Sequence, residues 1–468
     1  MVKVNGGLGK AGEAEQPAAT AHAAMTGAHD THDTHDMHDT ANDTGARATV
    51  ALPDAARDEH DAYAALRYPD FRRLLVGRFL GTLGEQMLTV AIGWELYLRT
   101  RSALALGLVG LVQVLPVIVL SLFAGQIADR YDRKRIVVLS QAGLAVCSFG
   151  LALLSAQQGP LLLIYGCLFL IGVGVAFNDP ASSSLLPQIV PAEQFANAAA
   201  WSSSSWQLAA VIGPALGGGV IALLGGATSV YLINALAGVA VVVLVASIRS
   251  RQAARKSEEI TMRSLLAGIA FLRRTPVLLA AITLDLFAVL LGGATTLMPI
   301  FATDILHVGA TGLGLLRAAP SVGAVVMALT LAHLPPFRRA GRTLLVAVAG
   351  FGVATIVFGI SHSFLLSLLM LALLGALDNI SVVIRSTLLL TRTPDEMRGR
   401  TAAVNLVFVG SSNELGGFES GVVAALFGPV LAVVAGGIGT VLVVAAVAWR
   451  WPEMRRLKRL DGLHDEAE

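Results

Sequence analysis

The chain has 468 residues, of which 55% are hydrophobic and only 14% are charged, and its formal net charge is +2. A soluble globular protein carries about 25% charged residues, so this composition excludes a large water-soluble core and favours a protein that crosses the membrane many times. The two cysteines, Cys147 and Cys167, both lie inside apolar runs, which excludes a disulfide framework and a cysteine-based metal site.

The first 67 residues are polar, rich in alanine and poor in large apolar side chains, and we expect them to form a disordered cytoplasmic tail (1–67). A near-repeat of His, Asp and Thr runs from His29 to Thr40 within this tail. Alternating His and Asp residues can chelate a divalent metal. The simpler interpretation is a low-complexity segment without a ligand, and we predict no metal site in the chain.

Twelve apolar runs follow, and each is long enough for a membrane-spanning helix, which needs roughly 20 residues. The predicted spans are 74–97, 103–126, 136–156, 160–181, 198–222, 227–248, 277–301, 310–333, 343–360, 364–390, 401–426 and 428–449. The predicted fold class is therefore an all-α polytopic membrane protein with twelve transmembrane helices. Basic residues concentrate in the loops on one side, so the positive-inside rule predicts that both termini are cytoplasmic.

The loop between the sixth and seventh spans is the longest internal connection, and its second part, 260–272, predicts an amphipathic helix on the inner membrane surface. We expect this loop to divide the chain into two six-helix bundles. The predicted parts are an N-terminal bundle at 68–248, a linker at 249–276, a C-terminal bundle at 277–450 and a cytoplasmic tail at 451–468.

The two bundles are related in sequence. A shift of 203 residues places the segment 185–193 on 388–396, and a shift of 204 places Gly110 on Gly314. Duplicated six-helix halves, related as two pseudo-repeats, are what an alternating-access transporter needs. The alternative is chance similarity between helices that are rich in Leu and Gly.

A charged hairpin, residues 125–135, joins the second and third spans and has six charges between positions 129 and 135. Its basic residues fix topology, but acidic residues contribute little to topology, so Asp129 points to a second role. We expect its carboxylate to accept hydrogen bonds from Arg133, or to face the N-terminus of a helix in the other half. Such a latch would hold the cytoplasmic side closed; the alternative is a topology anchor alone.

Ionisable residues inside the spans are costly, about 2.5–3.5 kcal/mol at mid-helix, and persist where they face a cavity or a partner. The candidates for binding a proton or the substrate are Arg78, Glu85, Gln86, Asp285, Arg317, Asp378, Arg385 and Glu414. A carboxylate in an apolar cavity can bind and release a proton near neutral pH, or hold a cationic substrate. The alternative is that these groups form structural ion pairs, for example Arg385 with Asp378.

The hairpin resembles the signature of the major facilitator superfamily, Gly-x-Leu-Ala-Asp-Arg/Lys-x-Gly-Arg-Arg/Lys-x-hydrophobic. The matching residues are Gly125, Ala128, Asp129, Arg130, Arg133, Lys134 and Ile136. Asp132 stands where the pattern has Gly, and it adds a negative charge to the turn. Through this resemblance the matching residues are expected to form a gating motif, and the helix that Asp129 faces is expected to be the eleventh span, which starts near Thr401.

A second motif lies in the fifth span. Gly213, Pro214, Gly217 and Gly218 resemble the Gly-Pro-x-x-Gly-Gly motif of the exporter branches of the superfamily. We expect a stiff, leak-proof seam there; the alternative is ordinary packing between small residues. The stretch 178–201 is similar to the group that contains the enterobactin exporter and macrolide efflux proteins, which are drug:proton antiporters.

The resemblance implies that spans 1, 4, 7 and 10 line a central cavity, with Glu85, Asp285 and Asp378 as its carboxylates. We predict proton-coupled export of a small amphipathic molecule, a drug or a siderophore, by a monomer in the inner or plasma membrane that binds no nucleic acid and uses no cofactor. ATP is not expected as the driver, because no Gly-x4-Gly-Lys-Ser/Thr pattern occurs. The alternatives are an importer of the same fold and a non-transporting sensor; an enzyme is not expected.

Overall fold

The computed structural model describes residues 61–249, 262–335 and 337–458. Within these ranges, side chains are not described at 121–122, 125–126, 128–130, 262–266, 395–396, 403 and 406–407. The His-rich segment from His29 to Thr40, with its metal-binding alternative, lies outside the described residues. In the described part of the chain, helices are the only regular secondary structure.

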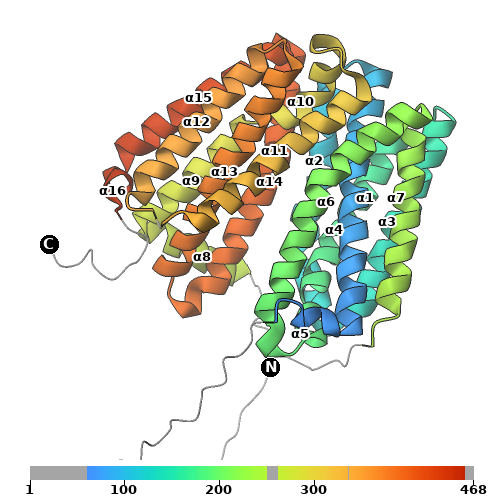
Figure 1. The fold of residues 1–468 in the computed structure, drawn as a ribbon, viewed down its shortest axis with the longest axis horizontal. Coiled ribbons are helices and arrows are strands. Elements are labelled where there is room, and N and C mark those ends of the chain that lie inside the picture. The colour runs from blue at the N-terminus through green and yellow to red at the C-terminus, as the bar shows by residue number, and fades with distance from the viewer. Residues whose placement is uncertain (1–60, 250–261, 336, 459–468) are drawn as a thin grey trace, which may run out of the picture. The chain divides into compact units, whose positions relative to one another are not determined.

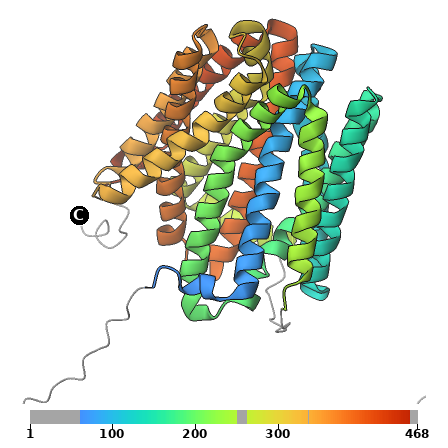
Figure 2. The same cartoon turned by 45° about the vertical axis from the view of Figure 1, so that its right-hand side comes forward.

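Among the described residues, helices make twelve crossings, as the apolar runs predict; their arrangement is drawn in Figure 1 and Figure 2. The N-terminal half contains α1 (Pro69–Thr100), α2 (Ala103–Arg130), α3 (Arg133–Ala156), α4 (Leu161–Ser183), α6 (Phe195–Leu224) and α7 (Ala227–Ala246). The C-terminal half contains α9 (Pro276–Leu291) with α10 (Ala294–Ile300), α11 (Gly309–His333), α12 (Ala340–Ile360), α13 (Phe364–Arg392), α14 (Asp395–Phe427) and α15 (Pro429–Arg450). Shorter helices are η1 (Ala64–Arg67), α5 (Leu186–Ile189), η2 (Ala192–Gln194), α8 (Met262–Arg274), η3 (Phe301–Ile305) and α16 (Pro452–Arg456).

Ten crossings within the described residues are long and apolar enough to span a membrane by length and composition. The other two, α1 and α14, have 32 and 33 residues but lower hydropathy. Polar and charged side chains interrupt both of them: α1 carries Arg78 and Glu85, and α14 carries Glu414. The two least apolar crossings therefore each hold candidate site residues.

The seventh crossing differs from the single span predicted at 277–301. It is interrupted at Gly292–Gly293 and ends in η3, which is a π-helix. The interruption lies where α14 approaches closely, because a Cβ placed on Gly293 would lie 2.6 Å from the carbonyl oxygen of Gly416. Packing against another helix thus breaks a run whose apolar pattern is continuous.

The start of α14 also differs from the prediction, since the helix begins at Asp395 rather than near Thr401. The linker helix α8 packs against this first part of α14. A Cβ on Gly268 of α8 would lie 3.0 Å from the carbonyl oxygen of Arg400. The described part of the linker is therefore held by the C-terminal half.

The two halves meet along two helix pairs, α2 with α14 and α6 with α11. A Cβ on Gly107 would lie 3.0 Å from the Cα atom of Gly421, and a Cβ on Gly218 would lie 2.9 Å from the Cα atom of Gly314. Small residues allow this close approach of backbones. In both pairs the second crossing of one half packs against the fifth crossing of the other, which is the arrangement that a duplicated chain produces.

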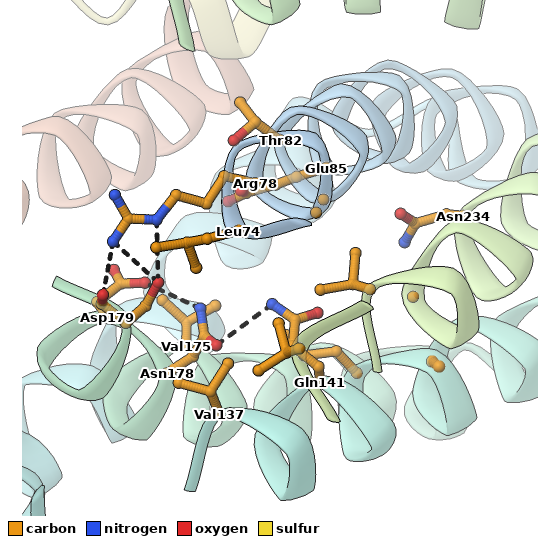
Figure 3. Close-up of a pocket in the computed structure, with 18 of the residues that line it drawn as sticks. Leu74, Arg78, Thr82, Glu85, Val137, Gln141, Val175, Asn178, Asp179 and Asn234 are labelled. Atoms are coloured by element: carbon orange, nitrogen blue, oxygen red, sulfur yellow. Dashed lines mark hydrogen bonds between the residues drawn. The ribbon is translucent and has the colours of Figure 1, made fainter. Parts of the chain in front are cut away.

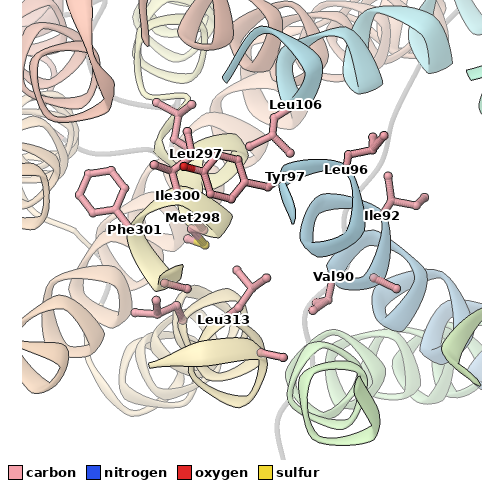
Figure 4. Close-up of a cluster of buried hydrophobic side chains, with 14 of the residues drawn as sticks. Val90, Ile92, Leu96, Tyr97, Leu106, Leu297, Met298, Ile300, Phe301 and Leu313 are labelled. Atoms are coloured by element: carbon pink, nitrogen blue, oxygen red, sulfur yellow. The ribbon is translucent and has the colours of Figure 1, made fainter. Parts of the chain in front are cut away.

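We call the side where α1 begins and α15 ends the terminal face, and the opposite side the far face. Buried apolar side chains from both halves pack together toward the far face, including Leu96 and Tyr97 of α1, Met298 of α10 and Leu313 of α11 (Figure 4). Beside them, the hydroxyl of Tyr97 donates a hydrogen bond to Asp304, and Arg101 donates another to Asp304 at 3.0 Å. In this structure the halves are therefore joined at the far face.

Candidate substrate and proton site

A cavity of about 460 Å³ lies inside the N-terminal half and is lined by α1, α3, α4, α6 and α7 (Figure 3). Its polar lining residues are Arg78, Thr82, Glu85, Gln141, Ser148, Asn178, Asp179, Ser182, Ser183, Ser202, Ser205 and Asn234. Polar groups inside a membrane bundle are costly and occur where they face water, a ligand or one another. This cavity is therefore the candidate functional site.

Arg78 ties the first crossing to the fourth. Its guanidinium donates hydrogen bonds to Ser182, at 2.6 Å to the carbonyl oxygen and at 3.2 Å to the hydroxyl. Asp179, one turn earlier on α4, attracts the same guanidinium electrostatically. Arg78 is thus held at one wall of the cavity, and its bonding partner is a neutral residue.

Glu85 lines the same cavity from the same helix, as its spacing of seven residues from Arg78 predicts. Its side chain is exposed to the cavity, and no cation among the described residues forms an ion pair with it. Asp179 and Glu414 are close enough to repel its negative charge. Glu85 is therefore an uncompensated acid inside the bundle.

Gln141, Asn178 and Asp179 were not predicted as site residues, although Asn178 and Asp179 begin the stretch that resembles the exporter group. Gln141 donates a hydrogen bond to Asn178 at 3.2 Å, and Asn178 donates one to Asp179 at 3.4 Å (Figure 3). The available signal was an Asn-Asp-Pro sequence, 178–180, at the end of an apolar run. These bonds join α3 to α4 along the cavity wall.

Gln86, predicted beside Glu85, points to a different surface. A Cβ on Gly213 would lie 2.6 Å from the Cβ of Gln86, which places Gln86 at the contact between α1 and α6. Gly217 approaches the same helix, and a Cβ there would lie 2.9 Å from the Cα of Met87. The motif of the fifth span therefore joins α6 to α1 through Gly213 and Gly217, and joins α6 to the other half through Gly218.

The acids of the C-terminal half are arranged differently. Asp285 of α9 and Arg385 of α13 form a buried ion pair, in which both side chains are 7% exposed. Arg385 thus forms a structural ion pair across helices, with Asp285, and not the pair with Asp378 on its own helix that was given as an example. Asp378 lines a space of only about 10 Å³ together with Asp285 and Ser381. This half offers a closed ion pair where the first half has an open cavity.

Glu414 lies at the seam between the halves. A Cβ placed on Gly110 of α2 would be 2.7 Å from a carboxylate oxygen of Glu414. Arg317 of α11 attracts Glu414 electrostatically and donates a hydrogen bond to the carbonyl oxygen of Thr295 at 3.3 Å. Together with the repulsion between Glu414 and Glu85, this links charged groups of one half to those of the other.

The hairpin between α2 and α3 is described in part. Asp132, the residue that departs from the family pattern, is the N-cap of α3 and accepts a hydrogen bond from the backbone N–H of Lys134 at 2.9 Å. The Lys134 ammonium donates to the carbonyl oxygen of Ile248 at 2.7 Å, just beyond the end of α7. Arg133 donates to the carbonyl oxygen of Ser184 at 3.5 Å. These basic residues thus hold helix ends together, in addition to any effect on topology.

The other gating residues, Gly125, Asp129 and Arg130, have side chains outside the described set. The latch between Asp129 and a helix of the other half therefore stays a prediction. Within the described residues, no group of three or more His, Cys, Asp or Glu side chains is placed to hold a metal ion.

The architecture matches solved transporters. A bacterial homologue of the human lysosomal transporter Spinster, in an inward-facing and unoccupied conformation, superposes with a TM-score of 0.64 at 14% identity over 82% of this chain and 98% of that one. A variant of the peptide transporter POT superposes with a TM-score of 0.65 at 12% identity over 84% of this chain and 96% of that one. This likeness shows the fold alone, which is that of the major facilitator superfamily.

A family model described as "transmembrane secretion effector" matches residues 60–464. The chain belongs to this family. Among curated relatives, the enterobactin exporter EntS of Citrobacter koseri is 29% identical over 405 residues, which is 86% of this chain and 96% of the relative. The enterobactin exporter EntS of Shigella boydii is 28% identical over 397 residues, 84% of this chain and 94% of the relative. The resemblance inferred from the two sequence motifs is confirmed.

Proposed function

We propose that this protein uses a proton gradient to export a small amphipathic molecule by alternating access. The observation that supports the proposal is the cavity of about 460 Å³, whose lining includes Glu85, Arg78 and Asp179. Sites for small molecules commonly have volumes of about 300–1,000 Å³. The cavity is large enough for at least part of such a ligand, and its lining combines charged, amide and aliphatic groups.

Proton coupling would use carboxylates that belong to different halves. Glu85 lies on α1 of the N-terminal half, and Glu414 lies on α14 of the C-terminal half. The two carboxylates would therefore move relative to each other when the two halves rock. The repulsion between these two carboxylates changes as their separation changes. Uptake or release of a proton at Glu85 would therefore favour one conformation over the other, which is what coupling requires.

The substrate proposal is a siderophore-like molecule, in keeping with relatives named as enterobactin exporters. Arg78 and the amides of Gln141 and Asn234 can donate hydrogen bonds to ligand oxygens. Leu74 and Val137 supply an apolar wall in the same cavity. An amphipathic ligand with clustered oxygen atoms satisfies both parts of this lining.

The protein would act as a monomer in the inner or plasma membrane, with the terminal face toward the cytoplasm and no cofactor besides the proton gradient. The basic residues of that face, among them Lys134 and Arg342, support the orientation through the positive-inside rule. A reporter fused after residue 468 should behave as cytoplasmic.

Export is tested with the full chain in inverted membrane vesicles. Uptake into these vesicles, which corresponds to export from the cell, is measured for a catecholate siderophore and for a cationic dye. We expect energised uptake that a protonophore abolishes. Uptake that is insensitive to the protonophore would contradict proton coupling, and transport in the opposite direction would favour an importer.

A further inference from the structure

The described end of the chain folds back onto the C-terminal half at the terminal face. The short helix α16 packs against α12, and the side chain of Met454 is fully buried. The backbone N–H groups of Ala340 and Gly341, at the start of α12, donate to the carbonyl oxygens of Lys458 at 3.0 Å and Leu457 at 3.4 Å. The tail segment is thus fixed by burial and by helix capping.

This docking creates a pocket of about 500 Å³, which we call the tail pocket. It is lined by Arg342, Leu345, Val346, Pro452, Arg455 and Arg456. Among the described residues, none of the three arginines forms an ion pair, and the acidic residue of α16, Glu453, is not part of the lining. Three guanidinium groups are therefore gathered around one space, and no carboxylate of the described residues neutralises them.

The other lining residues are apolar, and the pocket borders the surface that faces lipid. Val346 is 71% exposed on the outside of α12. Trp449, in the last turn of α15, is 82% exposed, and tryptophans are enriched where membrane helices meet the headgroup layer. The tail pocket therefore lies at headgroup depth, with arginines on its polar side and aliphatic groups on its membrane side.

We propose that the tail pocket binds the phosphate headgroup of an anionic phospholipid. The guanidinium groups are complementary to a phosphate in charge, and their paired N–H donors fit two phosphate oxygens at once. Val346 and Leu345 would contact the glycerol and the first part of an acyl chain. A free phosphate would use only the arginines and leave this apolar wall exposed to water, which is why the lipid is the better occupant. Bound lipid would bridge α12 and α16 and hold the tail in place.

The test is a titration of the purified full-length protein in detergent with phosphatidylglycerol, followed by native mass spectrometry. We expect saturable binding of phosphatidylglycerol and weaker binding of phosphatidylcholine. The triple variant Arg342→Gln, Arg455→Gln and Arg456→Gln should lose about fivefold in affinity per arginine, since one basic residue near an anionic surface contributes about 1 kcal/mol. The matched control, Arg338→Gln with Arg339→Gln, removes charges from the same face outside the pocket and should leave the affinity unchanged.

Thermal unfolding gives a second measurement and shows whether each variant is folded. Phosphatidylglycerol should raise the midpoint of the wild-type protein and of the control, and raise it less for the triple variant. Equal stabilisation by inorganic phosphate would overturn the lipid as occupant. Equal loss of affinity in the control variant would show a diffuse surface charge effect and overturn the pocket. Undiminished binding by the folded triple variant would overturn the proposal altogether.

Discussion

In each half an arginine links the first crossing to the fourth, but the arginine lies on the first crossing in one half and on the fourth crossing in the other. In the N-terminal half, Arg78 of the first crossing binds the neutral residue Ser182 of the fourth. In the C-terminal half, Arg385 of the fourth crossing binds the carboxylate of Asp285 on the first. The repeat shift of 203 residues places Ser182 on Arg385. The position on the fourth crossing is therefore equivalent in the two halves, whereas the position on the first crossing differs by one turn, because the same shift places Thr82 rather than Arg78 on Asp285.

The interiors of the two halves therefore differ in their charge and in their open space. The arginine of the first half leaves Glu85 uncompensated beside a cavity of about 460 Å³, whereas the arginine of the second half is neutralised and the space beside Asp285 and Asp378 measures only about 10 Å³. A duplicated scaffold has thus diverged into one half with an open, charged site and another with a closed ion pair. We infer that Asp285 has a structural role and that Glu85 is available for transport.

The largest expected effect on stability comes from breaking the buried ion pair between Asp285 and Arg385. Arg385→Met leaves the buried carboxylate of Asp285 without its partner and should destabilise the protein by about 3–5 kcal/mol. The measurement is unfolding of the purified protein in detergent. The double variant, Asp285→Leu with Arg385→Met, should recover most of the loss, because both buried charges are then removed. If both single and double variants are as stable as wild type, the structural role of the pair is wrong.

The seam that joins the halves gives the next effect. Gly218→Ala places a methyl group 2.9 Å from the Cα of Gly314, and overpacking of this kind costs about 1–3 kcal/mol. Gly219→Ala is the matched control, since a Cβ there meets nothing within 4 Å. Thermal midpoints of the two variants should differ clearly. Equal midpoints would mean that the contact between α6 and α11 accommodates the methyl group without strain. The glycine motif of α6 would then be ordinary packing between small residues.

The open site is tested by Glu85→Gln, which keeps the size of the side chain and removes its charge. Gradient-driven transport should fall about tenfold, because coupling free energies between sites are typically about 1–3 kcal/mol. Exchange without a gradient should persist, and stability should change little, because Glu85 has no ion-pair partner to lose. Glu419→Gln is the control: it removes a carboxylate of α14 that lies outside the cavity lining. Unchanged transport at every pH would remove Glu85 from the mechanism.

The smallest expected effect concerns the third crossing of each half. The start of α3 is capped by the side chain of Asp132, whereas the start of α12 is capped by carbonyl oxygens of the tail. Asp132→Ala should therefore cost about 1 kcal/mol, the usual value of an N-cap. Asp132→Asn, which keeps a capping oxygen, should restore most of it. A larger loss that Asn does not restore would show that the charge itself matters to the hairpin.

Much of the fold could be predicted because membrane crossings follow from the length of apolar runs. The candidate site was predicted less completely. Asp378 and Arg385 lie seven residues apart on one helix, which is about 10 Å along the axis, so a partner on a neighbouring helix is closer. Asp179 was missed as a site residue because its importance arises from Arg78, on a helix about 100 residues earlier. Pairings between helices do not follow from periodicity along one helix.

The sequence by itself determined the twelve crossings, the duplicated halves, the two motifs and the positions of the intramembrane charges, because each depends on local composition or on a match within the chain. Only the tertiary structure decided which charges are paired. It buried Asp285 against Arg385, left Glu85 facing a cavity, and placed Glu414 at the seam. The physical reason is that the free energy of a charge inside a membrane depends on groups within a few ångströms, and those groups come from distant parts of the chain.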